Sequence, residues 1–174
     1  NIRLPTEKAH GIQIMKMCEA FASAGHDVVL LVPKRKNTIN ANPFDFYGVQ
    51  RNFTIKRLWV PNILFLKSLG FWLQSVFFAE LSAWYMRYFK PDIVYSREER
   101  ILLNLIFVAK HIIWESHRGS WNITVEIVSK FAKKIIVISK GLNDFYCKKM
   151  PVISNKIILA PDGVDSNLFD LNLS

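Results

Sequence analysis

Cysteine is scarce in this sequence, and its two copies form no metal-binding pattern. Cys18 and Cys147 lie far apart and belong to no short Cys-x-x-Cys spacing. This excludes a disulfide framework and suits a reducing compartment, so we predict a cytoplasmic location. We expect both thiols to be core side chains rather than reactive groups.

The sequence also lacks a hydrophobic run long enough to cross a bilayer. Its most apolar stretch, residues 63–89, holds at most 12 consecutive uncharged residues, 68–79, whereas a span needs about 20 apolar residues. We therefore predict a helix there that is mostly buried. Its expected core stripe comprises Leu69, Trp72, Leu73, Val76, Phe77, Leu81, Trp84, Tyr85 and Tyr88. Three apolar side chains are left over for a membrane or a partner, namely Phe71, Phe78 and Met86.

Acidic residues are outnumbered by basic ones. The chain has 14 Asp and Glu residues and 23 Lys and Arg residues, which gives a formal net charge of +9. Such a surface favours anionic partners, and nucleotide phosphates, anionic lipid headgroups and nucleic acid all qualify. Nucleic acid is the weakest of these options because no recognised binding motif accompanies the charge. An anionic membrane surface would place the protein peripherally on the inner face of the membrane.

What the sequence does contain is a regular alternation of strand-like and helix-like segments. Its 174 residues, 51% of them hydrophobic, suit one globular domain. Because the first residue is Asn1 rather than Met, we interpret the chain as a piece of a longer one. Aliphatic or alternating runs predict strands at 28–32, 53–59, 93–95, 112–114, 135–138 and 157–159, and amphipathic periods predict helices from Gly11 to the turn at Gly25 and at 101–109, 123–132 and 142–150. The predicted fold class is α/β, with a doubly wound, mostly parallel Rossmann-like sheet.

Ligands of such sheets bind beyond the carboxyl ends of the strands, which directs attention to five places. They are His10-Gly11, Pro33 to Lys36, Ser96-Arg97-Glu98, Glu115-Ser116-His117 and Pro161 to Asp165. Glu115 and His117 are two residues apart at the end of a predicted strand, so their side chains share one side of it. They fit either acid–base catalysis at a hydroxyl group or an ordinary ion pair at the end of a strand. Arg97 and Glu98 follow the preceding strand, where they would contact an anionic or polyhydroxyl ligand or simply favour the next helix.

A third segment lies at the start of the first predicted helix. His10 and Gly11 precede outward-pointing amide groups, and a glycine there lets a phosphate approach the backbone closely. An ordinary helix entry explains the same residues, and neither a G-x-G-x-x-G nor a G-x-x-x-x-G-K-[ST] pattern occurs.

Several motifs together resemble the N-terminal domain of family-four glycosyltransferases. Their order and spacing match along nearly the whole chain, and the Pro-Asp-Gly-Val-Asp run near the end, with Phe169 four residues on, is the most specific. The motifs are Arg3-Leu4-Pro5, His10-Gly11, Ala24-Gly25-His26-Asp27-Val28, Lys90-Pro91-Asp92-Ile93-Val94, Glu115-Ser116-His117, Ile138-Ser139 and Ala160-Pro161-Asp162-Gly163-Val164-Asp165.

The resemblance implies one half of a GT-B fold. Residues 1–174 would be the acceptor-side domain, with the family's first strand lying just before Asn1 and the nucleotide-sugar-binding C-terminal domain absent from the chain. The implied reaction moves a sugar from a nucleotide sugar to a hydroxyl of a glycan or lipid-linked acceptor, with retention of configuration, in polysaccharide or cell-envelope glycan synthesis. The family's pattern implies no metal and no cofactor, and the chain alone should be inactive.

The resemblance also implies residue roles. His117 would be the catalytic residue beside the donor sugar, and Gly11 and His10 would lie at the donor diphosphate. The acceptor would contact Glu115, Arg97 and Glu98, and the interdomain segment would include Asp162, Gly163 and Asp165.

Two other functions fit parts of the same pattern. A nucleotide-sugar 2-epimerase would share the fold, but it predicts further carboxylates and histidines at strand ends. A non-catalytic module would use its basic and aromatic patches to bind an anionic membrane surface.

Overall fold

The computed structural model describes residues 3–63 and 67–163. The chain divides into two compact units, Asn1–Tyr88 and Phe89–Ser174, and each is described by itself. The strands form a two-stranded and a four-stranded sheet, and every strand pair is parallel. The predicted α/β class with a parallel, Rossmann-like arrangement is confirmed.

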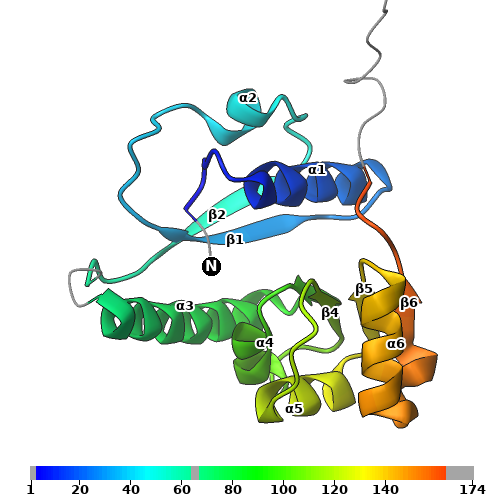
Figure 1. The fold of residues 1–174 in the computed structure, drawn as a ribbon. Coiled ribbons are helices and arrows are strands. Elements are labelled where there is room, and N and C mark those ends of the chain that lie inside the picture. The colour runs from blue at the N-terminus through cyan, green and yellow to red at the C-terminus, as the bar shows by residue number, and fades with distance from the viewer. Residues whose placement is uncertain (1–2, 64–66, 164–174) are drawn as a thin grey trace, which may run out of the picture. The chain divides into compact units, whose positions relative to one another are not determined.

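The first unit is built around one parallel strand pair. Its elements are α1 (Ala9–Ser23), β1 (Val29–Lys34), α2 (Pro43–Tyr47), β2 (Thr54–Trp59) and α3 (Lys67–Phe89), labelled in Figure 1. The ladder between β1 and β2 runs from the pair Val29 and Thr54 to the pair Lys34 and Trp59. A core cluster comprises Leu4, Met15, Cys18, Val32, Tyr47, Val49 and Phe53. Burial raises the pKa of the Cys18 thiol to about 12, which keeps it unreactive, as expected.

Strand β1 differs from its prediction in length and burial. It continues through Pro33 to Lys34 instead of ending at the proline, and Val29 is exposed while Leu30 is only half-buried. The reason is that β1 pairs with β2 alone among the described strands, so its other edge tolerates a residue without an N–H. The turn before β1 is as predicted, because Gly25 has a φ of +91°.

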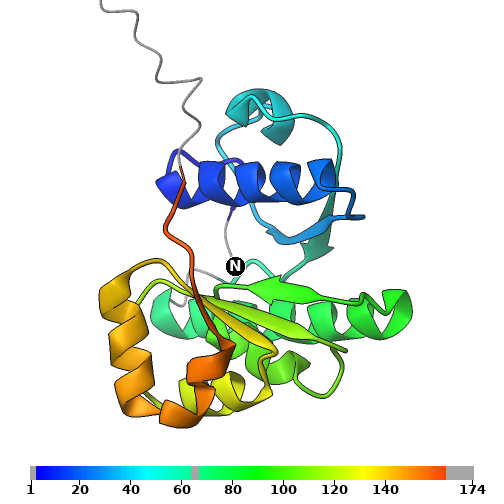
Figure 2. The same ribbon diagram turned by 90° about the vertical axis from the view of Figure 1, so that its right-hand side faces the viewer.

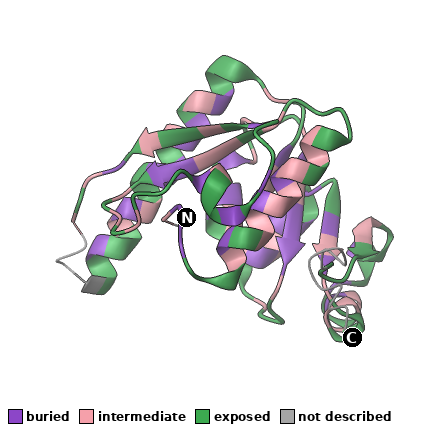
Figure 3. Cartoon of the chain, turned by 90° about the horizontal axis from the view of Figure 1, so that it is seen from above, coloured by how far each residue is buried: buried purple, intermediate pink, exposed green. Residues whose placement is uncertain are grey.

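Helix α3 corrects the expectation of a mostly buried helix with a core-facing aromatic stripe. Six members of that stripe point to solvent, and we call these six the α3 stripe: Leu69, Trp72, Val76, Phe77, Trp84 and Tyr88. Trp84 is 63% and Tyr88 75% exposed. The buried positions combine small residues with two of the predicted leftovers, and they include Ala79, Ser82, Ala83, Phe78 and Met86. Figure 3 shows exposed and buried residues side by side along this helix.

Apolar side chains of α3 occur on every face of the helix, so the pattern of hydrophobic spacing does not determine which face is buried. Small side chains let a helix approach its neighbours closely, and that advantage places Ala79 and Ala83 inward and the large rings outward. Within the described ranges, no helix is both long enough and apolar enough to span a membrane.

The second unit is a regular run of alternating strands and helices. Its elements are β3 (Val94–Ser96), α4 (Glu99–Leu105), β4 (Ile112–Ser116), α5 (Ile123–Phe131), β5 (Lys134–Val137), α6 (Lys140–Lys149), the 3-10 helix η2 (Pro151–Lys156) and β6 (Ile157–Leu159). The strands lie side by side in chain order, from β3 to β6 (Figure 2). Right-handed crossovers between strands in this order bring α4, α5 and α6 to one face of the sheet.

Two helices of this unit, α5 and α6, begin at side-chain caps. Asn122 accepts a hydrogen bond from the amide of Val125 at 3.0 Å, and Ser139 accepts one from the amide of Leu142 at 3.3 Å. Helix α4 is shorter than predicted and ends at Leu105, which leaves Phe107 exposed. Strands β3 and β4 are parallel neighbours, so their carboxyl ends lie at the same edge of the sheet.

Candidate functional site

A buried carboxylate lies at the carboxyl end of the second unit's sheet. Glu115 is the penultimate residue of β4, and its side chain is only 3% exposed. Strand β3 runs alongside, with Tyr95 in register with Ile113, so the end of β3 reaches the same edge. A buried charge is costly unless donors surround it, so the neighbours of Glu115 determine whether the site is stable.

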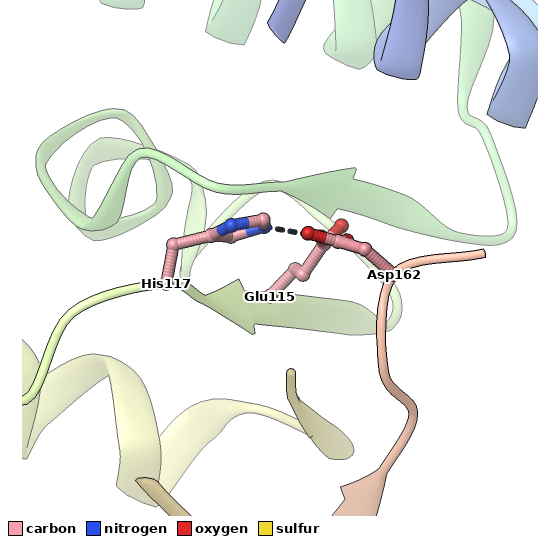
Figure 4. Close-up of side chains that lie close together, drawn as sticks. All are labelled: Glu115, His117 and Asp162. Carbon is pink, nitrogen blue, oxygen red and sulfur yellow. Dashed lines mark hydrogen bonds and ion pairs between the residues drawn. The ribbon is translucent and has the colours of Figure 1, made fainter. Parts of the chain in front are cut away.

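Three donors meet this carboxylate. The Tyr95 hydroxyl donates to Oε2. Nε2 of His117 donates to Oε1 (Figure 4). The Arg97 guanidinium approaches Oε1 at 2.9 Å, and its side chain is 17% exposed. We call Tyr95, Arg97, Glu115 and His117 the Glu115 cluster. Both carboxylate oxygens thus accept hydrogen bonds from protein groups.

These contacts set the protonation states in the cluster. Burial alone would raise the pKa of Glu115, but the hydrogen bonds from Tyr95 and His117 and the charge of Arg97 outweigh it and lower that pKa. Burial, together with the hydrogen bond to the Glu115 carboxylate, raises the pKa of Tyr95. Glu115 is therefore ionised and Tyr95 neutral at neutral pH.

A second set of hydrogen bonds fixes the backbone on either side of His117. The Tyr146 hydroxyl, on α6, donates to the carbonyl oxygen of Arg118 at 2.7 Å and lies 2.8 Å from Oγ of Ser116. Tyr146 is fully buried, and its ring meets that of Trp114 edge-on at 5.5 Å. The turn that carries His117 is therefore anchored to α6 as well as to β4.

A further carboxylate comes from the segment after β6. Asp162 is exposed, and its carboxylate, a Glu115 oxygen and a His117 nitrogen all lie within 4.8 Å of one another (Figure 4). Three such groups can hold a metal ion in principle. The Arg97 guanidinium already lies on Oε1 of Glu115, however, and its positive charge opposes a cation at that point.

A comparison with known protein families gives a match over most of the chain. The sequence profile described as Glycosyltransferase Family 4 matches residues 11–168. The chain belongs to Glycosyltransferase Family 4. A search of curated proteins found no match.

A solved structure shares the fold of this family member. The Anabaena protein Alr3699/HepE, solved in complex with UDP-glucose, aligns with a TM-score of 0.58 and 10% sequence identity. The alignment covers 97% of this chain and 44% of the HepE chain, so the present chain spans less than half of that protein. At this identity the likeness concerns the fold.

The family resemblance assigned roles to residues that the structure brings together only in part. His117, Glu115 and Arg97 meet in the Glu115 cluster, and Asp162, which we predict to belong to the interdomain segment, lies beside it. Glu98 is exposed at the N-cap of α4, and its side chain takes part in none of the hydrogen bonds described for this cluster. Gly163 is exposed with open space around it, and Asp165 lies outside the described residues.

The two family residues expected at the donor diphosphate belong to the first unit. His10 is half-buried at the start of α1, and Gly11 is buried. A Cβ on Gly11 would overlap the Tyr47 hydroxyl and lie 2.7 Å from the Thr6 methyl group. The Tyr47 hydroxyl itself donates to the Thr6 carbonyl at 2.7 Å and accepts from the Thr6 amide at the same distance. Packing against this tyrosine therefore already requires a glycine at position 11.

Tyr95 and Tyr146 belong to the site but were not predicted from the sequence. Tyr95 lies inside β3 rather than after it, and Tyr146 lies on α6, far from β4 in the sequence. Strand-end position identified Arg97, because it follows β3 directly. A signal for Tyr95 was its place two residues before Arg97, on the same side of an extended chain.

Proposed function

We propose that this chain is the acceptor-side half of a retaining glycosyltransferase. The carrying observation is the Glu115 cluster, a fixed polar site at the carboxyl ends of parallel strands in a member of Glycosyltransferase Family 4. UDP-glucose, bound in the HepE structure, is a nucleotide sugar, and it supports a donor of that class.

In the proposed reaction the bond between the sugar's anomeric carbon and the diphosphate oxygen breaks. A new bond forms between that carbon and the acceptor oxygen on the same face of the sugar. The acceptor's proton leaves with the nucleoside diphosphate, so atoms and charge balance. The donor is shared with a C-terminal domain, and the acceptor is a glycan or a lipid-linked sugar.

The geometry supports a specific role for His117. A carboxylate oxygen only accepts hydrogen bonds, so the shared proton in the contact between His117 and Glu115 resides on Nε2. In the tautomer with its proton on Nε2, the ring has a lone pair on Nδ1 that can accept a hydrogen bond from a sugar hydroxyl. Glu115 acts as a positioning residue, because both of its oxygens are engaged by the protein.

The other residue roles that the family resemblance implies belong to the same proposal. Arg97 and Glu98 contact acceptor hydroxyls, Gly11 and His10 approach the donor diphosphate, and the segment from Asp162 leads to the second domain. We also propose that transfer requires no metal or cofactor, because the Arg97 guanidinium provides the positive charge beside Glu115.

The test is His117→Ala in the full-length protein, with His111→Ala as the matched control. His111 is also a half-buried histidine, and it lies just before β4 rather than after it. We expect kcat to fall at least about 100-fold in His117→Ala and to change less than about twofold in His111→Ala. Far-ultraviolet circular dichroism should show that both variants are folded, although His117→Ala should lose about 1–2 kcal/mol of stability with its hydrogen bond to Glu115.

Three outcomes would refute parts of the proposal. Unchanged turnover in folded His117→Ala would remove His117 from the reaction centre. A product with inverted anomeric configuration by NMR would exclude retention, and an epimerised nucleotide sugar with no transfer would favour the epimerase. A rate that EDTA abolishes would show that a metal is needed.

A second candidate function is peripheral binding to an anionic membrane. The observation that favours it is the α3 stripe, which exposes Trp, Tyr, Phe and aliphatic side chains on a chain of net charge +9. Aromatic rings suit the interface of a bilayer, and each nearby basic residue adds roughly 1 kcal/mol of attraction to anionic lipid. A lipid-linked acceptor would be consistent with this location.

Flotation of the full-length protein with vesicles tests the membrane candidate. We expect binding to anionic vesicles at low salt, loss of binding at high salt, and weaker binding when Trp72 and Trp84 are both changed to serine. Trp114→Phe is unsuitable as a control because Trp114 is buried, so Trp59→Ser, an exposed tryptophan on β2, serves instead. Equal binding to neutral and anionic vesicles would contradict the candidate.

A further inference from the structure

A cavity of about 490 Å³ lies in the first unit, beside the carboxyl end of β1. The segment from Pro33 to Pro43 forms much of its wall, Leu4 and Pro5 close another side, and Arg57 of β2 completes it. Its volume is within the range of roughly 300–1,000 Å³ that small-molecule sites occupy. None of the residues of the Glu115 cluster lines it.

The lining is strongly positive. Lys34, Arg35 and Arg57 all contribute, and none of the twelve described lining residues is acidic. Three cations around one concave space repel one another unless an anion is bound between them. Arginine presents paired N–H donors that match phosphate oxygens, and lysine adds a point charge.

The strand pair places two of these cations on one face, and an aromatic ring contacts the third. Arg57 is in register with Val32, two residues before Lys34, so the side chains of Lys34 and Arg57 project from the same face of the strand pair. The Arg35 guanidinium lies over the Phe71 ring, 5.5 Å from its centroid. Such stacking fixes the guanidinium plane, and it leaves the charge in place.

The opposite wall of the cavity is also ordered by hydrogen bonds. Asn37 donates from Nδ2 to the carbonyl oxygen of Pro5 at 2.8 Å, and its Oδ1 accepts from the amide of Ile39 at 3.2 Å. Asn42 caps α2 by accepting from the amide of Phe44 at 3.0 Å. The loop after β1 is therefore tied to the segment around Pro5, and the cavity has two defined walls.

We propose that this cavity binds a phosphate or diphosphate group of a substrate through Lys34, Arg35 and Arg57. The inference rests on the proposed glycosyltransferase function only for the identity of that substrate. A diphosphate carries two to three negative charges and several oxygens, so more than one cation can contact it at once, whereas a carboxylate carries a single charge. The group belongs either to a phosphorylated or lipid-linked acceptor or to the nucleotide donor.

The test compares two double variants of the full-length protein that lose the same charge. Lys34→Gln with Arg57→Gln removes two lining cations, and Lys36→Gln with Lys56→Gln removes two exposed neighbours that do not line the cavity. The probe is inorganic pyrophosphate, titrated by calorimetry. We expect the first pair to weaken binding at least about tenfold and the second less than about twofold. Equal affinities in both pairs, or no binding by the wild-type protein, would overturn the proposal.

Two further arms identify the source of the phosphate. If the cavity serves the acceptor, the first pair will lose binding to a sugar 1-phosphate or to neutral vesicles that contain a prenyl diphosphate, and it will keep its affinity for UDP. If the cavity serves the donor, UDP binding will fall as pyrophosphate binding does. Far-ultraviolet circular dichroism checks that each variant is folded.

The same experiment separates this proposal from the transferase proposal. His117→Ala should keep its pyrophosphate affinity, because His117 does not line the cavity. A protein in which His117→Ala abolishes turnover but the lining pair leaves binding unchanged would refute the cavity and retain the transferase. If instead the lining pair weakens pyrophosphate binding and His117→Ala leaves turnover unchanged, the cavity proposal stands and the role of His117 in transfer is refuted.

Discussion

The two units use positive charge in opposite ways. In the second unit, Arg97 lies against the buried carboxylate of Glu115 at 2.9 Å, and the Tyr95 hydroxyl and the His117 ring complete the arrangement. In the first unit, Lys34, Arg35 and Arg57 surround a cavity with no acidic residue in its described lining. The comparison teaches that in the second unit protein groups satisfy a buried charge, whereas in the first unit cations gather around a space that a ligand can enter.

The largest effect should come from removing the central anion. Glu115→Gln leaves Arg97 partly buried beside a neutral amide, and breaking a buried ion pair costs about 3–5 kcal/mol. We expect the free energy of unfolding in urea to fall by about 3 kcal/mol. Glu126→Gln, which breaks the Lys130 pair on the surface of α5, should cost less than about 1 kcal/mol. Similar losses in the two variants would mean that the Glu115 cluster is no more than a surface pair.

A smaller and more direct contrast comes from one arginine in each unit. Arg97→Gln removes a charged hydrogen bond to a buried acceptor, and it should lower the free energy of unfolding by about 2 kcal/mol. Arg57→Gln relieves repulsion within the cavity lining, so without ligand it should change stability by less than about 0.5 kcal/mol. Urea unfolding in phosphate-free buffer measures both. A large loss in Arg57→Gln would show that this side chain stabilises the fold, contrary to the comparison.

The smallest effect concerns the pH dependence of stability. Because the folded protein lowers the pKa of Glu115 below its ordinary value of 4.5, the stabilisation from its ionised form is fully present above pH 4.5 and declines as the pH falls through the lowered pKa. Tyr95→Phe removes one of the hydrogen bonds that lower this pKa, so it should cost about 1–2 kcal/mol at pH 7 and less under acidic conditions.

The measurement is the difference in unfolding free energy between wild type and Tyr95→Phe at pH 3 and at pH 7. Tyr88→Phe, an exposed tyrosine of the α3 stripe, is the matched control and should show no such dependence. A difference that is independent of pH would indicate that the Tyr95 hydroxyl stabilises the fold without acting on Glu115.

The sequence was informative where residue types and strand ends coincide. Short aliphatic runs predicted all four strands of the second unit, because such runs have one stable place in an α/β protein, the interior of a parallel sheet. Arg97, Glu115 and His117 were identified for the same reason, since they follow or end those strands. Their mutual hydrogen bonds follow from the parallel register of β3 and β4.

Other features depended on packing that the spacing of residues does not encode. Helix α3 is apolar all around, so small residues such as Ala79 and Ala83 determined its buried face and turned Trp84 outward. Tyr95 and Tyr146 reach the site from within β3 and from α6, so only the three-dimensional contacts reveal them. The cavity beside β1 likewise depends on a loop whose course the sequence did not predict.

The hydrogen bonds of Tyr146 have a consequence for the way the protein opens. Because this buried side chain holds the turn between Ser116 and Arg118 to α6, the amides around His117 should exchange with solvent deuterium only when α6 itself detaches. The turn that carries His117 and helix α6 would then form one cooperative unfolding unit, rather than a turn that fluctuates independently of the helix. In Tyr146→Phe, exchange at His117 should become faster than exchange within α6, and the two segments would unfold as separate units.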